Sequence, residues 1–225
     1  ARTEGRRALL EIEAKQLLSS HGAAVPGERL ASSSKEAAEA AEALGGPVVL
    51  KIVSPDILHK SDAGGVKVNL AGQKQVQSAY RQIMESAKAY NPAADIRGVL
   101  VSPMAQRGVE VIIGTKTDDQ FGPVIMYGLG GVMVEILKDV SFRVLPISRR
   151  SARRMIEETK SAPILTGVRG EPPYDKKALV ELLLLCSEVM ESYPEIEEMD
   201  LNPVIVHHEG LSIVDARIIL KEEGN

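Results

Sequence analysis

The chain has few of the residues that mark several common protein classes. Cys186 is the one cysteine among 225 residues, so no disulfide forms within the chain, which fits a reducing compartment. There is no Trp and only 3% of the residues are aromatic, which argues against a surface that stacks nucleic-acid bases. The net charge of −4 also argues against a general nucleic-acid binder. We therefore expect no nucleic-acid partner.

Long apolar segments are missing as well. The longest apolar run covers residues 182–186, far short of the roughly 20 residues that cross a membrane. The first residues, Ala1 to Glu4, lack the apolar centre of a signal peptide, so we expect a cytoplasmic protein without membrane contact. A hydrophobic content of 44% is enough to bury one substantial core, or two lobes that share a cleft. The composition indicates a protein for a small anionic ligand.

Apolar periodicity and turn residues predict alternating helices and strands, and hence an α+β fold. The clearest start signal is Ser33 with Glu36, a capping box before an alanine-rich helix that stops at Gly45 and Gly46. Further helices are expected over residues 9–18, 73–90, 151–160 and 175–191. Strands are expected over residues 48–53, 66–70, 99–101, 109–113, 123–127 and 132–137, and then in a hairpin of 199–206 with 212–220. We expect one domain, 1–225, in two lobes of residues 1–101 and 102–225, hinged near 101–106.

The expected hairpin at the end of the chain places polar side chains together. Its turn is His207-His208-Glu209-Gly210, so Val206 should face Leu211, and the same register puts Asn202 opposite Asp215. Asp200 shares a side with Asn202 because strand side chains alternate. Two carboxylates and an amide on one face suit Mg²⁺ that carries a phosphate chain, and a plain exposed polar face is the alternative.

The usual glycine-rich phosphate loops do not occur. The sequence has no Gly-x-x-x-x-Gly-Lys-Ser/Thr loop. Residues 128–131 (Gly-Leu-Gly-Gly) resemble a dinucleotide fingerprint, but Met133 stands where its third glycine belongs, and β-branched residues follow where a helix should begin. The glycines of segment 122–131 still allow either a close approach of the backbone to a ligand or a tight turn between strands.

The segment 51–67, Lys-Ile-Val-Ser-Pro-Asp-Ile-Leu-His-Lys-Ser-Asp-Ala-Gly-Gly-Val-Lys, carries the strongest functional signal. It places Lys51 near the end of a β-branched strand and His59 in a polar loop, and then leads through Gly64 and Gly65 into a second strand. Lysine, histidine and acid on flexible backbone beside a sheet are groups that phosphoryl transfer needs. Taken alone, His59 fits an idle exposed residue better than a functional one, and Lys51 also fits a strand-edge lysine.

Eight segments occur in the order that one enzyme family shows: 51–67, 108–114, 120–124, 128–131, 135–139, 167–170, 200–204 and 214–217. In these segments the chain resembles the ATP-grasp β subunits of ADP-forming acetyl-CoA synthetases, which are NDP-forming acyl-CoA synthetases. Succinyl-CoA synthetase β subunits are a poorer match. The resemblance covers nearly the whole chain, and it implies an ATP-grasp fold of two lobes with a nucleotide cleft between them.

The resemblance implies a reversible reaction in which acyl-CoA, ADP and phosphate give a carboxylic acid, ATP and CoA. It also implies a separate CoA-binding α subunit as partner, in an α2β2 heterotetramer. His59 matches the histidine that accepts the phosphoryl group, which a neutral imidazole nitrogen can do at pH 7. Asp200 matches a carboxylate that orients and stabilises the phosphohistidine ring. His59 and Asp200 are therefore the expected catalytic residues.

A site for ATP or ADP with Mg²⁺ is implied in the same way. Lys51 matches the lysine that holds phosphate oxygens, and Glu110 matches a glutamate near the nucleotide. Asn202 and Asp215 match the metal-binding pair, in agreement with the hairpin register.

Three further residues are assigned to the nucleotide. Ser102 and Met104 lie in the hinge strand, where the family often has an acidic residue and this chain does not, which leaves the choice between ATP and GTP open. Arg169 lies between Gly167 and Gly170, which would let its guanidinium approach a phosphate closely.

Two other functions are weighed against this one. A nucleotide-sensing module without catalysis would be favoured by loss of His59 or of the metal residues, and these are present. A self-sufficient ATP-grasp ligase that forms an acyl-phosphate would need its own acceptor lobe, for which 225 residues leave little room. The basic run 149–154 is interpreted either as a solvated helix face or as a docking site for an acidic α subunit.

Overall fold

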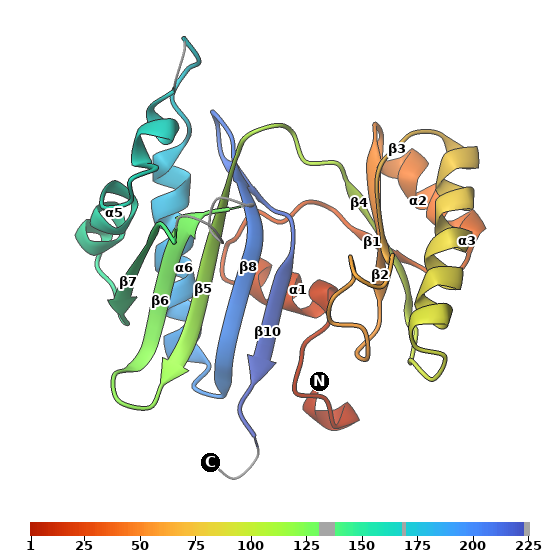
Figure 1. Cartoon of the computed structure of the whole chain (residues 1–225), viewed down its shortest axis with the longest axis horizontal. Helices are drawn as coiled ribbons and strands as arrows, with labels where there is room; N and C mark the ends of the chain where they lie inside the picture. The colour runs from red at the N-terminus through yellow and green to blue at the C-terminus, as the bar shows by residue number, and fades with distance from the viewer. Residues whose placement is uncertain (131–137, 168–169, 223–225) are drawn as a thin grey trace. The chain divides into compact units, whose positions relative to one another are not determined.

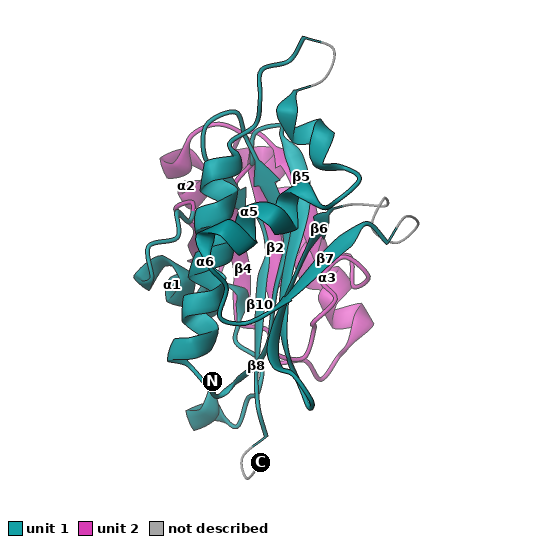
Figure 2. Cartoon of the chain, turned by 90° about the vertical axis from the view of Figure 1, so that its left-hand side faces the viewer, with its two compact units in different colours: residues 1–25, 105–225 teal, residues 26–104 magenta. Residues whose placement is uncertain are grey.

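The computed structural model of the chain describes residues 1–130, 138–167 and 170–222. The chain forms two compact units (Figure 2). Unit 1 consists of Ala1–Val25 with Ala105–Asn225, and unit 2 consists of Pro26–Met104. The chain passes from unit 2 to unit 1 within the predicted hinge, 101–106, whereas the first 25 residues, expected in the first lobe, belong to unit 1.

Unit 2 is an antiparallel sheet covered on one face by two helices (Figure 1). The strand order is β1 (Arg29–Ala31), β4 (Gly98–Pro103), β2 (Val48–Val53) and β3 (Val66–Leu70). The covering helices are α2 (Ser34–Leu44) and α3 (Gln73–Tyr90), and their buried residues form one core with alternate residues of β2. The predicted bounds of β2, β3 and α3 are confirmed.

The start and end of α2 follow the predicted local signals. The Ser33 hydroxyl accepts a hydrogen bond from the Glu36 N–H at 3.2 Å, which satisfies one free donor of the first turn. The Glu36 carboxylate accepts from the N–H of Ser32, at 2.8 Å, and not from that of Ser33. Gly45 ends the helix with a φ of 71°, a backbone angle that glycine adopts without steric cost.

Unit 1 is a larger antiparallel sheet with helices α1, α5 and α6 on one face (Figures 1 and 2). Its strands in spatial order are β10 (Ala216–Leu220), β8 (Ile196–Val206), β5 (Val109–Asp118), β6 (Gly122–Leu129) and β7 (Val140–Val144), with β9 (Leu211–Ile213) also paired to β8. The helices are α1 (Glu11–Ser20), α5 (Arg149–Glu157) and α6 (Lys176–Ser192), and two short 3-10 helices cover Arg2–Glu4 and Ala162–Thr166.

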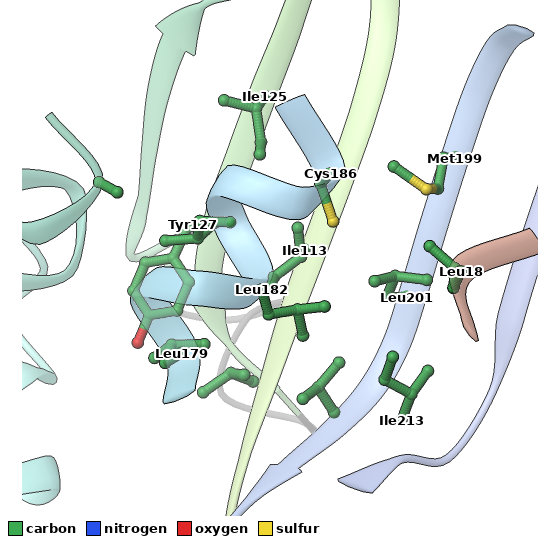
Figure 3. Close-up of a cluster of buried hydrophobic side chains, with 14 of the residues drawn as sticks. Leu18, Ile113, Ile125, Tyr127, Leu179, Leu182, Cys186, Met199, Leu201 and Ile213 are labelled. Carbon is green, nitrogen blue, oxygen red and sulfur yellow. The ribbon is translucent and has the colours of Figure 1, made fainter. Parts of the chain in front are cut away.

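The core of unit 1 lies between this sheet and its helices. Figure 3 shows Cys186 of α6 among side chains of the sheet such as Ile113 and Leu201. Cys186 is fully buried, and burial raises the pKa of its thiol to about 12, so it is an inert core residue. In the described part of the chain, no helix is long and apolar enough to span a membrane.

Two strands, β1 and β7, were not predicted from the sequence. β1 has three residues and pairs with β4, while β7 forms the edge of the unit 1 sheet beside β6. β1 is placed by a partner distant in the sequence, so no local pattern marks it, whereas β7 pairs with the preceding strand, β6. The strand predicted over 132–137 falls outside the described residues.

Candidate functional site

One face of the unit 1 sheet carries the acidic and amide side chains that the sequence indicated. On β5, Glu110 is exposed between two residues of the buried core. On β8, Asp200 and Asn202 alternate with Leu201, which is buried under the helices. Because strand side chains alternate, these three residues lie on the face opposite the helices, here called the open face.

The register predicted for the last hairpin is confirmed on both sides of Asp215. The pairs Val206–Leu211, Ile205–Ser212 and Val204–Ile213 join β8 to β9, and Leu201–Ala216 and Asp200–Arg217 continue the same register into β10. The ladder opens between them, because Val214 and Asp215 belong to no strand. Asn202 and Asp215 therefore occupy corresponding positions at a break in the sheet.

The Asp200 carboxyl lies on the open face in surroundings that disfavour its ionised form. Its neighbours across the strands are Gly114 of β5 and Arg217 of β10. Burial raises the pKa of the Asp200 carboxyl, the charge of Arg217 opposes this rise, and the charges of Glu198 and Asp215 add to it. The ionised form of Asp200 is thus costly here, although Arg217, which donates to Glu198 at 2.6 Å, offsets part of the cost.

The glycine-rich segment approaches the protein's own backbone. The N–H of Gly130 donates to the Glu110 carbonyl at 2.7 Å. A Cβ at Gly130 would lie 3.0 Å from the carbonyl carbon and the Cβ of Glu110, so a side chain there would push the two segments apart. Gly122, with a φ of 74°, ends the turn between β5 and β6, as the turn alternative predicts, and Gly130 secures the backbone beside Glu110. The approach of this segment to a ligand stays a prediction.

The donors on the open face fit a magnesium ion that is shared with phosphates. Within the described ranges, no group of three His, Cys, Asp or Glu side chains is arranged to hold a metal by itself. Mg²⁺ is commonly held by one or two carboxylates together with phosphate oxygens and water. The Asp215 carboxylate and the exposed Asn202 amide match that kind of partial site.

A groove of about 850 Å³ runs along the open face from Asp200 to the β5–β6 turn. Gly114 forms its floor beside Asp200, and Lys116 and Glu198 add charged groups to its lining. Both Phe residues of the chain, Phe121 and Phe142, line it with 66% and 55% of their surface exposed. Acidic side chains therefore line the groove both beside Asp200 and at the β5–β6 turn, where Asp118 and Asp119 accompany Phe121.

Lys51 lies in the interior of the unit 2 sheet. β2 pairs with β4 on one side and β3 on the other, with Leu100 and Val66 facing Lys51. The interpretation of Lys51 as a strand-edge lysine is therefore wrong. Its side chain is 5% exposed and lies on the face opposite the core residues Leu50 and Ile52. A lysine this deeply buried is rare in proteins and indicates a specific use.

His59 projects from a compact loop of unit 2. The loop is anchored by Ile57 and Ala63, which are buried in the unit 2 core. The N–H of Gly65 donates to the Lys60 carbonyl at 2.7 Å, which closes the turn. His59 is exposed, and none of the described residues forms a hydrogen bond with its ring. The structure thus holds the loop at its base and leaves the imidazole accessible.

Two glycines at the base of this loop are tightly packed. A Cβ at Gly65 would lie 2.4 Å from the Cγ2 of Ile52, so only glycine fits against the strand. Gly64 has a φ of 62°, and a Cβ there would lie 3.1 Å from Ser86. These glycines therefore serve close packing at the base of the loop.

The other three histidines are engaged in local contacts. A ring nitrogen of His21 lies 3.1 Å from the Leu17 carbonyl, that of His207 lies 2.9 Å from the Ser212 hydroxyl, and His208 stacks on Tyr174 at 4.5 Å between ring centroids. His208 is also exposed, so what distinguishes His59 among the described residues is an exposed ring without a hydrogen bond or a ring contact.

The structure gives little support to the assignment of Ser102, Met104 and Arg169 to the nucleotide. The hydroxyl of Ser102 is buried and donates to the Glu28 carboxylate at 2.7 Å. Its side chain is therefore used in a hydrogen bond within unit 2. Met104 is 42% exposed, and its N–H donates to the Pro47 carbonyl at 2.9 Å. Arg169 lies outside the described residues.

Comparisons with known proteins point to one family. A family model for the ATP-grasp domain matches residues 1–220. The β subunit of acetate–CoA ligase (ADP-forming) II from Pyrococcus furiosus is 51% identical over 97% of this chain and 94% of its own length. The chain belongs to the family of ATP-grasp β subunits of ADP-forming acetate–CoA ligases. A relative from Archaeoglobus fulgidus, acetate–CoA ligase (ADP-forming) I, is 48% identical over 94% of this chain but only 31% of its own length.

Solved structures support membership in the acetate–CoA ligase family. The dinucleotide-forming acetyl-coenzyme A synthetase 1 of Ca. Korarchaeum cryptofilum, in complex with coenzyme A, Ca-AMPCP and HgCl+, has a TM-score of 0.95, with 51% identity over 98% of this chain and 96% of that chain. The same enzyme with coenzyme A and Mg-AMPPCP, whose phosphohistidine segment points towards the nucleotide binding site, has a TM-score of 0.86 and 48% identity at the same coverage. The predicted family and the ATP-grasp fold are confirmed.

Sequence reasoning missed one contact beside the candidate metal site in this acetate–CoA ligase family member. Lys15 of α1 donates to the Val214 carbonyl at 2.8 Å, next to the predicted metal ligand Asp215. Glu11 and Lys15 stand four residues apart on one helix, which is a visible signal. Such a pair is usually solvated, and the burial of both side chains sets this pair apart.

Replacing Asp200 by Asn is expected to raise the melting temperature of the nucleotide-free chain at neutral pH. The pKa of Asp200 is raised in the folded state, so its contribution to stability is fully present below the unfolded pKa and is lost as pH rises through the folded pKa. The Asn variant does not ionise, and its advantage should disappear in acid. Melting curves from pH 3 to pH 8 measure this, with exposed Asp119→Asn as the control. A variant less stable than wild type at neutral pH would show that attraction to Arg217 outweighs burial.

Proposed function

We propose that the chain is the nucleotide-binding β subunit of an ADP-forming acyl-CoA synthetase, with acetyl-CoA as the representative substrate. The overall reaction is acyl-CoA plus ADP plus phosphate to carboxylate, ATP and CoA, and it is reversible. The observation that carries this proposal is the match to ligase β subunits over nearly the whole chain, together with an accessible His59 and acidic open face. ATP or ADP and Mg²⁺ are the proposed cofactors.

His59 is the proposed phosphoryl acceptor. In the direction of ATP formation, a ring nitrogen of His59 attacks the phosphorus of a phosphoryl group on the partner subunit. A new N–P bond forms while the bond to the partner's carrier breaks. A β-phosphate oxygen of ADP then attacks the same phosphorus, and the N–P bond breaks with its electron pair returning to the imidazole. Asp200 is the carboxylate proposed to accept a hydrogen bond from a phosphohistidine ring and orient it.

Lys51 and the open face are proposed to neutralise phosphate charge. The buried ammonium of Lys51 would bind phosphate oxygens as a compact charge, and Glu110 would bind the nucleotide away from the phosphates. Asn202 and Asp215 would hold Mg²⁺, which when bound neutralises charge on the phosphate oxygens. Phosphoryl transfer depends mainly on such positioning and charge neutralisation. Ser102, Met104 and Arg169 stay predictions, and for Ser102 only its backbone remains free of the contact with Glu28.

A CoA-binding α subunit is the proposed partner, in an α2β2 assembly. The support is that a relative matched over nearly its whole length is a β subunit, whereas a single-chain ligase of the family is about three times as long as this chain. The arginines of the basic run on α5 differ in their contacts. Arg149 forms an ion pair with Glu181 of α6, while Arg153 and Arg154 are exposed. The location in the cytoplasm stays a prediction from the sequence.

Magnesium-dependent nucleotide binding tests the proposal. Calorimetry should show that the chain alone binds ADP more tightly with Mg²⁺ than with a chelator, because metal ligands and phosphates share the ion. Asp215→Ala should weaken the Mg²⁺-dependent part by about 10-fold or more, and the exposed helix variant Glu188→Ala should not. Nucleotide binding that ignores both the metal and Asp215 would overturn the metal assignment.

A further inference from the structure

The segment that carries Asp215 is held by a side chain from a distant part of the sequence. Between β9 and β10, Val214 and Asp215 leave the strand ladder. The N–H of Val214 donates to the Pro203 carbonyl at 3.0 Å. The carbonyl of Val214 accepts a hydrogen bond from the Lys15 ammonium at 2.8 Å. Lys15 thus supplies, from α1, the hydrogen bond that a strand neighbour would otherwise make.

Lys15 makes this bond from inside the core. Its side chain is 2% exposed, and its ammonium also donates to the Glu11 carboxylate at 2.9 Å. Glu11 is equally buried, so two opposite charges are removed from water on adjacent turns of one helix. Removing ions from water is costly, and apolar residues of similar size commonly fill such a place with no loss of stability. The pair is therefore poorly explained by stability and better explained by what it holds.

The helix that carries Lys15 is itself firmly placed against β10. The N–H of Leu9 donates to the Ile218 carbonyl at 2.9 Å, and the N–H of Leu220 donates to the Arg7 carbonyl at 2.9 Å. Ala14 and Leu18, which flank Lys15 on α1, are fully buried in the unit 1 core. The position of Lys15 is therefore fixed by the packing of α1, and its hydrogen bond to the Val214 carbonyl restricts the backbone next to Asp215.

We propose that Lys15 is a positioning residue, which, paired with Glu11, fixes the 214–215 break so that the Asp215 carboxylate is preset for Mg²⁺. This inference rests on the proposed function, because it takes Asp215 as a metal ligand. Groups that orient a metal ligand usually contribute about 10- to 100-fold to metal affinity. Lys15 touches neither the metal nor the nucleotide in this account, and its whole effect passes through the backbone at Val214.

The test separates positioning from stability with two variants. Lys15→Met leaves Glu11 buried without its ion partner, and it should lower both the melting temperature and the Mg²⁺-dependent affinity for ADP. Lys15→Met combined with Glu11→Leu removes both charges, and its melting temperature should recover. The Mg²⁺-dependent affinity of the double variant should stay about 10-fold weaker than that of wild type, because the hydrogen bond from Lys15 to the Val214 carbonyl is still missing. Affinity for ADP in chelator should match wild type throughout.

A matched control exists on α2, where Lys35 and Glu39 form a pair of the same spacing with 84% and 62% exposed side chains. Lys35→Met with Glu39→Leu should change neither Mg²⁺-dependent binding nor local hydrogen exchange. In the metal-free double variant at Lys15 and Glu11, exchange of the Val214 and Ala216 amides should become faster, while amides in the centre of β5 keep their protection.

The outcomes are distinguishable. Recovery of both melting temperature and Mg²⁺-dependent affinity in the double variant would overturn the inference, since Lys15 would then act only through stability. Unchanged Mg²⁺-dependent affinity in the Lys15 variants, with a weakened Asp215→Ala, would overturn this inference alone. Unchanged affinity in Asp215→Ala would instead overturn the proposed metal role of Asp215, and the inference with it.

Discussion

His59→Ala, assembled with its CoA-binding partner, is expected to lose acyl-CoA-dependent ATP formation by about 10³-fold or more, since the nucleophile that carries the phosphoryl group is removed. Nucleotide binding should be nearly unchanged. The reason is structural: His59 is exposed at the end of a loop whose anchors, Ile57 and Ala63, are untouched by the substitution. Coupled ATP assays measure the loss, and calorimetry with Mg-ADP measures the binding.

Controls for His59 come from the same chain. His208→Ala removes another exposed histidine, stacked on Tyr174, and should keep activity. The wild-type chain without its partner should form no ATP from acyl-CoA. Incubation of the complex with labelled ATP, followed by mass spectrometry for acid-labile phosphate, should place the β-chain label on His59. Full label on another β-chain histidine, or an active His59→Ala complex, would show that the loop is structural.

Lys51→Met is expected to weaken ADP and ATP binding by about 100-fold. A hydrogen bond to a charged group is worth about 1.5–3 kcal/mol, and the loss of an ammonium from a buried position removes it without replacement by water. Because β2 is paired on both sides, the direction of the Lys51 side chain is set by the sheet, so Met should occupy the same space. Calorimetry gives the affinity, and thermal melting shows whether the fold persists.

The matched control for Lys51 is Lys88→Met, an exposed lysine of α3 in the same unit. It removes the same charge from the chain and should leave nucleotide affinity unchanged. If Lys51→Met melts like wild type and binds ADP equally well, Lys51 does not hold phosphate. Equal weakening in both variants would mean that net charge, and not a specific contact, attracts the nucleotide.

The sequence by itself determined the features that depend on neighbouring residues. Ser33 and Gly45 bound α2 because capping and a left-handed φ are local properties, and the turn at 207–210 sets the register of β8 against β9 and β10. The family also followed from the sequence, because many motifs in order are specific together. The run of leucines around Cys186 likewise predicts a buried thiol, and Cys186 is buried in the core.

Only the tertiary structure decided which distant segments meet. It put residues 1–25 in the unit of the last strands, Lys51 on an interior strand, Gly130 against Glu110 and the Ser102 hydroxyl on Glu28. It also turned Glu11 and Lys15 from a helix pair of ordinary spacing into a buried support beside Asp215. Spacing along a helix predicts which side chains are neighbours, but the burial of those side chains depends on what packs against the helix. That contact joins residues about 200 positions apart, so no local pattern encodes it.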